Sequence, residues 1–274
     1  MDSLKPSEIV ANMVQAGIAK AALGPFDLLV RGALSGALLG FATSLAITAT
    51  VQTGQPIVGA VIFPVGFVMI VLMGLELVTG SFALVPLALL RGRASPTTVL
   101  INWSWVFAGN LIGSMLYAAL LAIALTMAGQ VEPVGVAAAI IKIAELKTLG
   151  YAHYGTAGLI TAFVKAILCN WMVCLGVVMA LSSTSTIGRI AGAWMPILIF
   201  FAQGFEHSVV NMFVIPAGMM MGAKVSLADW WLWNEIPVTL GNLVGGLLFT
   251  GLALYVTFGR TEAPLPAALP ADAD

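Results

Sequence analysis

Charged residues are scarce in this sequence. Asp, Glu, Lys and Arg make up 8% of its 274 residues, whereas a soluble domain carries roughly a quarter. So few charges cannot cover the surface of a water-soluble globule, which excludes an ordinary soluble enzyme, a nucleic-acid-binding protein and a disordered chain. The formal net charge of −1 points to no strongly acidic or basic partner.

Groups that could carry catalysis are scarce as well, since the chain has two histidines and two cysteines. Cys169 and Cys174 lie five residues apart in an apolar run and would face different sides of a helix, so no disulfide is expected. The His-Glu-x-x-His, Gly-x-Ser-x-Gly and phosphate-loop motifs are absent. We therefore predict neither an enzyme nor a metal or cofactor site.

Hydrophobic residues make up 60% of the chain and its mean hydropathy is +1.04, which predicts an all-α integral membrane protein. A spanning helix needs about 20 apolar residues, and six apolar runs are present, so residues 28–258 predict a six-span transmembrane domain. Residues 1–27 predict an amphipathic cytoplasmic helix over about 6–23, and residues 259–274 predict a disordered cytoplasmic tail. The runs are 28–50, 56–90, 98–127, 156–182, 190–225 and 236–258.

Two of these runs are too long for one span. Runs of about 35 residues would extend roughly 50 Å as helices, against about 30 Å of hydrocarbon. Residues 56–90 contain Glu76 and Thr79 near the middle, and residues 190–225 contain Glu206 and His207. We predict that spans two and five are broken helices whose breaks are lined by protein or water.

The two broken segments also match each other in sequence. Glu76 and Glu206 are each followed ten residues later by proline, and a Gly-Asn pair follows at 109–110 and again at 241–242. This register predicts two repeats, about 28–127 and 156–258. Because each holds three spans, the second copy would be inverted in the membrane, as in many transporters and channels.

The distribution of Lys and Arg predicts the orientation of the spans. Under the six-span reading, seven cations fall on one side and three on the other, which places both termini in the cytoplasm. The seven are Lys5, Lys20, Arg31, Arg91, Arg93, Arg189 and Arg260; the three are Lys142, Lys147 and Lys224.

His207 is the first candidate functional residue, because a titratable group in mid-membrane is functional by default. The alternative is a histidine hydrogen-bonded into a helix bundle. Thr79 occupies the corresponding break and can bond a substrate oxygen or an imidazole. For Glu76 and Glu206 we expect a structural role, accepting bonds from backbone N–H groups freed at the breaks, with acid–base chemistry as the alternative. Asn211 and the other intramembrane asparagines are expected to tie helices together.

Five segments carry a resemblance to a known family. They are Glu-Leu-Val-Thr-Gly (76–80), Asn-Trp-x-x-Val-Phe-x-Gly-Asn (102–110), Ile-Leu-Cys-Asn-Trp-Met-Val-Cys-Leu (167–175), Gly-Phe-Glu-His-Ser-Val-Val-Asn-Met (204–212) and Ile-Pro-Val-Thr-Leu-Gly-Asn (236–242). Over residues 5–260 the chain resembles the formate/nitrite transporter family. The resemblance implies an aquaporin-like six-span fold with an inverted repeat, in a homopentamer with one pore per protomer.

The resemblance also implies a substrate class, small monovalent anions of weak acids, and a set of pore residues. His207 matches the central pore histidine and Thr79 the gate threonine. The other matched positions are Asn170, Val173, Phe63, Phe200 and the gate-loop Leu77. Val78 stands where Phe is usual and Phe67 where Leu is often found, and both changes are expected to reshape the inner constriction. Lys147 resembles an anion-attracting lysine of the outer vestibule, but it lies behind an insertion of about seven residues, and Lys165 is the alternative.

We therefore expect a channel or transporter of the inner membrane that carries formate with a proton, by way of the central histidine. Within the family the alternatives are nitrite, hydrosulfide or lactate. The alternative of another class is an aquaporin-like pore for neutral solutes, although the Asn-Pro-Ala motifs that such a pore would carry are absent.

Overall fold

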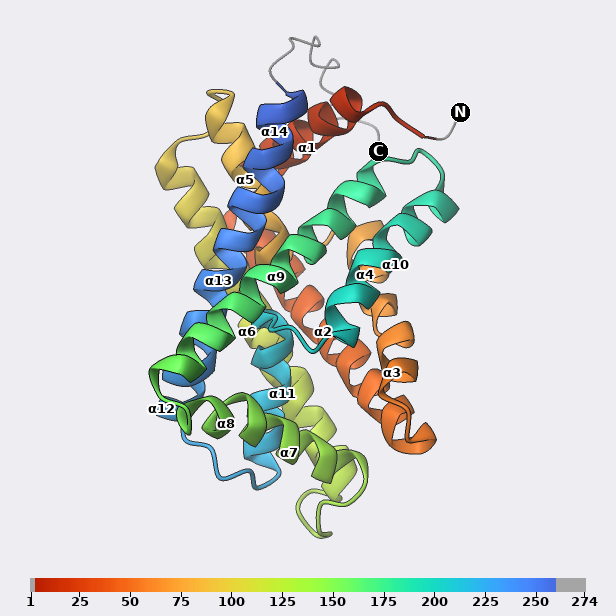
Figure 1. Cartoon of the computed structure of the whole chain (residues 1–274), viewed down its shortest axis with the longest axis vertical. Helices are drawn as coiled ribbons and strands as arrows, with labels where there is room; N and C mark the ends of the chain where they lie inside the picture. Colours follow the sequence, from red (N-terminus) through yellow and green to blue (C-terminus); the bar gives the residue numbers. More distant parts are fainter. Residues whose placement is uncertain (1–2, 260–274) are drawn as a thin grey trace.

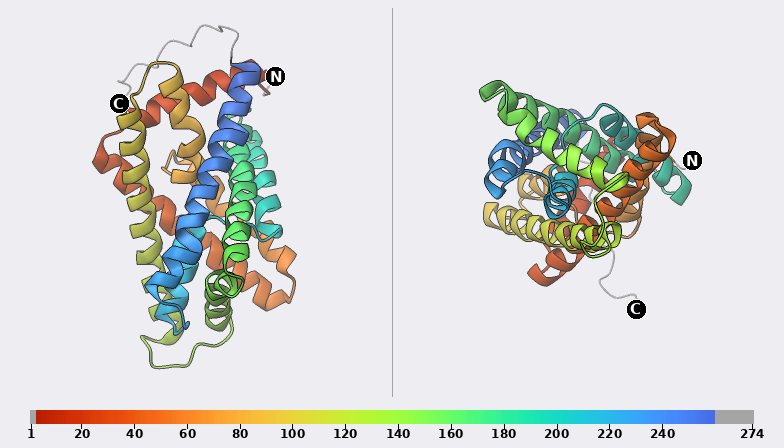
Figure 2. Two further views of the ribbon diagram at one scale, coloured as in Figure 1. Left: turned by 60° about the vertical axis from the view of Figure 1, so that its left-hand side comes forward. Right: turned by 90° about the horizontal axis from the view of Figure 1, so that it is seen from below.

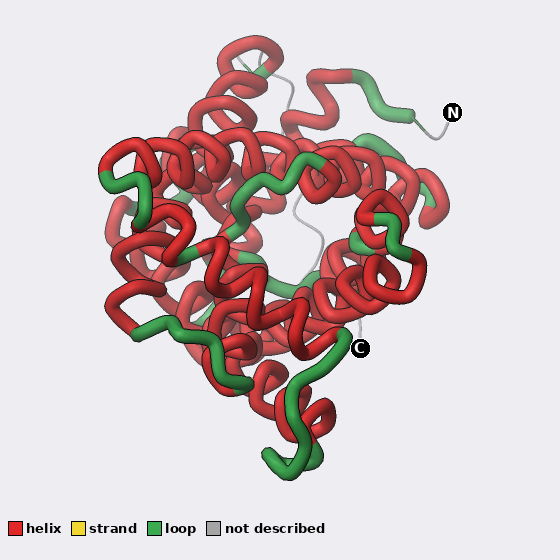
Figure 3. The backbone as a smooth tube through the Cα atoms, turned by 60° about the horizontal axis from the view of Figure 1, so that its bottom comes forward, coloured by secondary structure: helices red, strands yellow, loops and turns green. Residues whose placement is uncertain are grey.

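The computed structural model describes residues 3–259, and throughout this range the chain forms helices joined by short connections (Figures 1 and 3). Residues 260–274, which include Arg260 and the whole predicted tail except Gly259, lie outside the described residues. The helices are α1 Pro6–Ala21, α2 Pro25–Thr53, α3 Pro56–Ile62, α4 Pro64–Leu72, α5 Val78–Leu90, α6 Pro96–Thr126, α7 Val136–Lys147, α8 Leu149–Ala152, α9 Thr156–Leu181, α10 Thr186–Ala202, α11 Ser208–Met220, α12 Leu227–Trp230, α13 Ile236–Gly246 and α14 Ala253–Phe258, with π-helical turns at Trp231–Glu235 and Leu247–Leu252.

Four helical stretches are long and apolar enough to cross a membrane. They are α2, α6, α9 and the continuous stretch Leu227–Phe258. Two further apolar segments are interrupted, as the sequence indicates. The first is interrupted between α4 and α5, and the second between α10 and α11. Residues 56–72 also divide at Phe63 because Pro64 has no N–H to continue the helix ladder.

Glycine allows the long helices to pack closely in pairs, α2 against α6 and α9 against α13. A Cβ atom on Gly36 of α2 would clash with the backbone carbonyl of Asn110 on α6. A Cβ on Gly245 of α13 would clash with the carbonyl of Ile167 on α9 in the same way. Small residues at such contacts let two backbones approach, which is the usual way that helices associate without a hydrophobic driving force.

The short helix α1 lies across one end of the molecule, the end at which α14 also finishes (Figures 1 and 2). The sequence left open whether its apolar face meets lipid or protein. Val10, Met13 and Val14 are buried and pack with Leu84 and Leu87 of α5, so the face meets protein. At the opposite end lie α7 and α8, two helices that the apolar runs do not predict.

Candidate permeation site

The site is built on the two helix breaks, which have nearly the same backbone conformation. Gly74 and Gly204 both adopt positive φ, at 63° and 64°. Leu77 precedes α5 with φ −122° and ψ 120°, and His207 precedes α11 with φ −119° and ψ 119°. From these starting points α5 and α11 run toward opposite ends of the molecule (Figure 1).

One asparagine holds each break. Asn110 Oδ1 accepts a bond from the Val78 N–H (2.9 Å), and its Nδ2 donates to the Gly32 and Glu76 carbonyls (2.8 and 2.9 Å). Asn242 makes the same three bonds in the other half, to the Ser208 N–H and to the Ala166 and Glu206 carbonyls, at 2.9, 2.8 and 2.9 Å. In each half the amide therefore binds the first N–H of the helix after the break and the carbonyl of the glutamate in the break, and it joins both to a carbonyl of a neighbouring long helix.

The expectation that the glutamate carboxylates accept these backbone bonds is wrong. The asparagines occupy the N–H groups, and each carboxylate binds a lysine instead. Glu76 accepts two bonds from Lys20 Nζ of α1 (2.8 and 2.9 Å), and Glu206 accepts one from Lys147 Nζ of α7 (2.7 Å). Both carboxylates are buried, and a buried carboxylate requires a cation or several donors.

A second asparagine in each half holds the backbone of that lysine. Asn102 Nδ2 donates to the Lys20 carbonyl and Asn234 Nδ2 to the Lys147 carbonyl, both at 2.9 Å. From the sequence, Lys20 was expected only as one of the cations that set the orientation of the spans, and no role was expected for Asn234. The repeat register could have indicated both residues. Lys20 and Lys147 are 127 positions apart and Asn102 and Asn234 are 132 apart, close to the 130 positions between Glu76 and Glu206.

The two carboxylates differ in how many groups bind them. Glu206 accepts further bonds from Tyr151 Oη (2.7 Å), Asn211 Nδ2 (2.8 Å) and Asn234 Nδ2 (3.4 Å). Burial and the neighbouring Glu206 carboxylate raise the pKa of the Tyr151 hydroxyl, so this group remains a donor. Among the described residues, Glu76 has no hydrogen-bond donor besides Lys20, so the break at 73–77 is held by fewer bonds.

Thr79 and His207, proposed from sequence as partners in the two breaks, lie in contact. Thr79 Oγ1 is 3.1 Å from His207 Nε2, and both residues are buried. His207 Nδ1 accepts the Val210 N–H at 3.2 Å and so caps α11. In the neutral ring this bond puts the hydrogen on Nε2. Thr79 Oγ1 then accepts from the imidazole, and its own hydrogen remains available for another acceptor.

Residues of α9 contact the backbone carbonyl of Thr79. Asn170 Nδ2 donates to the Thr79 carbonyl (3.0 Å) and to the Asn242 carbonyl (2.6 Å), and Cys174 Sγ lies 3.3 Å from the Thr79 carbonyl. Val173, which lies between Asn170 and Cys174 in the sequence, is completely buried. Cys169 and Cys174 are free thiols, in agreement with the prediction of no disulfide.

Aromatic rings close the space beside the histidine. The Phe200 ring stacks on the His207 ring with centroids 5.8 Å apart, and Phe63 meets Phe200 edge to face at 5.7 Å. Phe67, Leu77 and Val78 are buried in the same apolar cluster. The surroundings of the Thr79–His207 pair are therefore apolar on several sides.

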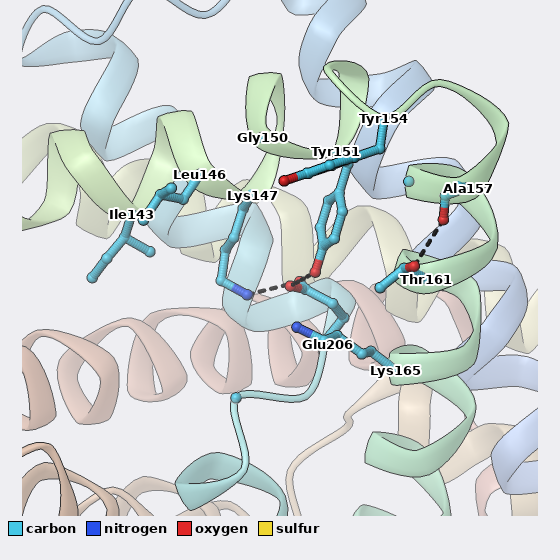
Figure 4. A pocket seen from close by; sticks show the side chains of 12 residues that line it. Ile143, Leu146, Lys147, Gly150, Tyr151, Tyr154, Ala157, Thr161, Lys165 and Glu206 are labelled. Atoms are coloured by element: carbon cyan, nitrogen blue, oxygen red, sulfur yellow. Dashed lines mark hydrogen bonds and ion pairs between the residues drawn. The ribbon is translucent and has the colours of Figure 1, made fainter.

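A cavity of about 600 Å³ opens at the end of the molecule formed by α7 and α8. Lys147 and Lys165 both line it, so the structure brings together the two lysines that the sequence gave as alternatives. Figure 4 shows the Lys147 and Tyr151 side chains of this cavity pointing at the Glu206 carboxylate. Lys165 Nζ lies 5.9 Å from the centre of the Tyr151 ring and has no carboxylate partner among the described residues.

A second cavity, of about 270 Å³, lies at the other end beneath α1. Phe67, Leu77 and Gly80 line it together with Glu76 and Lys20. Gly80 follows Thr79 directly, so this cavity approaches the Thr79–His207 pair from the side opposite to the first.

Comparison with known proteins agrees with this architecture. A family model described as formate/nitrite transporter matches residues 7–256. A probable formate transporter of Methanothermobacter thermautotrophicus is 38% identical, over 94% of this chain and 96% of its own. A solved structure described as an FNT family ion channel superposes with a TM-score of 0.80 at 28% identity, over 91% of this chain and 98% of its own.

A second solved structure, a pentameric formate channel with formate bound, superposes with a TM-score of 0.69 at 25% identity, over 86% of this chain and 98% of its own. The match of the family model runs through both helix breaks and through every residue of the site described above. The chain belongs to the formate/nitrite transporter family.

Proposed function

We propose that this protein carries small monovalent weak-acid anions, formate above all, across the inner membrane together with a proton. The observation that carries the proposal is the contact between Thr79 and His207 at the starts of two helices, in apolar surroundings and between two cavities lined by cations. Helix N-termini carry partial positive charge and favour anions.

The membrane arrangement that we propose has six spans in two inverted halves with both termini in the cytoplasm. Four long apolar helices and two interrupted apolar segments support this count of spans. The matched bonds of Asn110 and Asn242, and of the two Lys–Glu pairs, support the repeat. The cations at the α1 end outnumber those at the other end, which favours a cytoplasmic α1 end. They are Lys5, Lys20, Arg31, Arg91, Arg93 and Arg189.

The assembly that we propose is a homopentamer with one pore in each protomer. The similar pentameric formate channel supports it. Large apolar side chains on the outer faces of the long helices, including Phe41, Leu45 and Leu116, are exposed in the single chain and would meet lipid or a neighbouring protomer.

In the mechanism that we propose, Lys147 and Lys165 concentrate the anion and the constriction then removes its water. A bare anion in an apolar pore pays several kcal/mol or more in desolvation, and the same desolvation favours the protonated acid. The Thr79 hydroxyl donates its free hydrogen to the anion, while His207 Nε2–H holds the threonine oxygen. A water molecule in the cavity then gives a proton to the anion and leaves hydroxide in that cavity. The substrate crosses as the neutral acid and releases the proton to water on the other side.

The neutral imidazole is a hydrogen-bond donor in this scheme. Because the Val210 N–H occupies Nδ1, the ring meets the substrate path through Nε2 alone. A net proton drawn from the neutral ring would leave an imidazolate, so the proton that crosses is supplied by water and the ring orients the hydroxyl that binds the anion.

Nitrite, hydrosulfide and lactate are the other substrates that the same site would accept, and Val78 and Phe67 are the residues that we expect to set the size limit. A pore for neutral solutes is the alternative of another class. Such a pore would show glycerol flux and no flux of formate or the other anions.

The test of the site is the variant His207→Asn in proteoliposomes. Asparagine keeps a side-chain acceptor at the cap of α11 but removes the imidazole N–H from Thr79. We expect the rate of formate flux to fall by at least about tenfold, as for loss of a positioned hydrogen-bond donor, while the thermal stability of the protein changes little. Wild-type flux in this variant would contradict the role of the imidazole.

A further inference from the structure

The cavity beneath α1 contains two arginines that nothing in the site described above uses. Arg31 comes from the second turn of α2 and Arg189 from the first turn of α10, and both line this cavity. Each is partly buried. Within residues 3–259, neither side chain has an ion pair or a hydrogen bond to another group of the protein.

The charge of this cavity is strongly positive. Lys20, Arg31 and Arg189 line it together with one carboxylate, Glu76, which Lys20 already neutralises. The cavity at the other end is lined by Lys147, Lys165 and Glu206, and Lys147 pairs with Glu206. That cavity therefore has one cation without a carboxylate partner, whereas the cavity beneath α1 has two. A cleft with one sign of charge and low-dielectric walls concentrates ions of the opposite sign.

The chemistry of the two arginines narrows the kind of anion. A guanidinium stays charged at every physiological pH and presents two parallel N–H donors to a planar pair of oxygens. Formate, nitrite and other monocarboxylates offer such a pair. Hydrosulfide has a single heavy atom and cannot accept both donors in the same way.

We propose that Arg31 and Arg189 form an anion-binding site at the inner mouth, selective for planar anions with two oxygens, that loads the pore from the α1 side. This inference rests on the proposed function for its consequence, transport, but not for binding itself. Phe67 and Leu77 also line this cavity, whereas Thr79 does not, so in this proposal the arginines bind the anion before it enters the apolar constriction and loses its water.

The transport test uses membrane vesicles of the two orientations, because each exposes one mouth. Formate uptake into inside-out vesicles reports entry from the inner face, and uptake into right-side-out vesicles reports entry from the outer face. In Arg31→Gln and Arg189→Gln we expect the KM for inner entry to rise by about fivefold each at low salt, the factor that one charge pair at contact supplies in watery surroundings. The KM for outer entry should stay unchanged.

Three further variants make this result specific. Arg93→Gln removes the same charge from an exposed position at the same end, outside the cavity, and should leave both KM values unchanged. Lys165→Gln should raise the KM for outer entry instead. Arg189→Lys keeps the charge but loses the paired donors, so it should weaken formate and nitrite entry while leaving hydrosulfide entry unchanged. Equal shifts at both faces, or no shift in either arginine variant, would overturn the proposal.

Binding can be read without transport by chemical labelling of arginine. Phenylglyoxal modifies guanidinium groups, and mass spectrometry of the purified protein counts the label at each arginine. Formate and nitrite should protect Arg31 and Arg189 more than chloride or hydrosulfide does at equal ionic strength, and should leave Arg93 unprotected. Absence of formate flux in the wild type together with this protection would refute the proposed function and keep the anion site; flux without protection would refute the site.

Discussion

The two Lys–Glu pairs should differ in how much stability they supply, because their carboxylates are held differently. Lys20 is the single donor to Glu76 among the described residues, and the Glu76 side chain is 3% exposed. Removing one partner of a buried pair costs about 3–5 kcal/mol, since the other charge is left uncompensated. We therefore expect Lys20→Met to destabilise the protein by an amount in this range.

The matched change in the other half should cost less. After Lys147→Met, Glu206 still accepts bonds from Tyr151, Asn211 and Asn234. The loss then resembles that of one hydrogen bond to a charged group, about 1.5–3 kcal/mol. Lys20→Met should be the more destabilised of the two variants.

The assay is unfolding of the detergent-solubilised protein, followed by intrinsic tryptophan fluorescence and analysed as a double-mutant cycle. Glu76→Gln should restore most of the stability lost in Lys20→Met, because the buried charge is then gone. A loss in Lys147→Met equal to or greater than that in Lys20→Met would refute the reasoning, as would failure of Glu76→Gln to restore stability.

Three further predictions follow from packing and hydrogen bonding. Gly36→Ala should destabilise the protein by at least about 1 kcal/mol because its Cβ meets the Asn110 carbonyl, as overpacked sites do; Gly24→Ala, where nothing lies within 4 Å, is the matched control in the same unfolding assay. Asn242→Leu should cost at least about 2 kcal/mol, since it leaves the Ser208 N–H and the Glu206 carbonyl without the amide that binds them; a stable, fully active Asn242→Leu protein would refute this role of Asn242. Val78→Phe should reduce lactate flux more than formate flux in proteoliposomes, because a larger ring narrows the buried inner constriction; equal loss of both fluxes would argue against a size role for this position.

The sequence predicted the elements whose signals are local. The helix breaks follow from run length and from polar residues in mid-run, and the structure has them between α4 and α5 and between α10 and α11. The expectation that Thr79 and His207 act together followed from their places in the two matched breaks, although the register of Glu76 with Glu206 aligns His207 with Leu77 and Thr79 with Val209. The distance of 3.1 Å between Thr79 Oγ1 and His207 Nε2 depends on the packing of both halves and could not be predicted from the sequence.

The contacts that the sequence did not predict join residues far apart in the chain. Lys20 lies 56 residues from Glu76 and Lys147 lies 59 residues from Glu206, so no local spacing connects them. The donors expected for the glutamates were wrong, because Asn110 and Asn242 bind the freed N–H groups and lysines bind the carboxylates. Helices α7 and α8 were missed because their residues form no long apolar run, although α7 supplies the lysine that binds Glu206.

The central claim, that a proton crosses with each anion, is tested most directly by the stoichiometry of transport. Radiolabelled formate uptake and internal pH would be recorded together in proteoliposomes, with protein-free liposomes as the control for passive entry of the acid. We predict one proton per formate, internal acidification, and no dependence of the initial rate on membrane potential. Formate uptake that builds up a potential without acidification, or glycerol flux without formate flux, would contradict it.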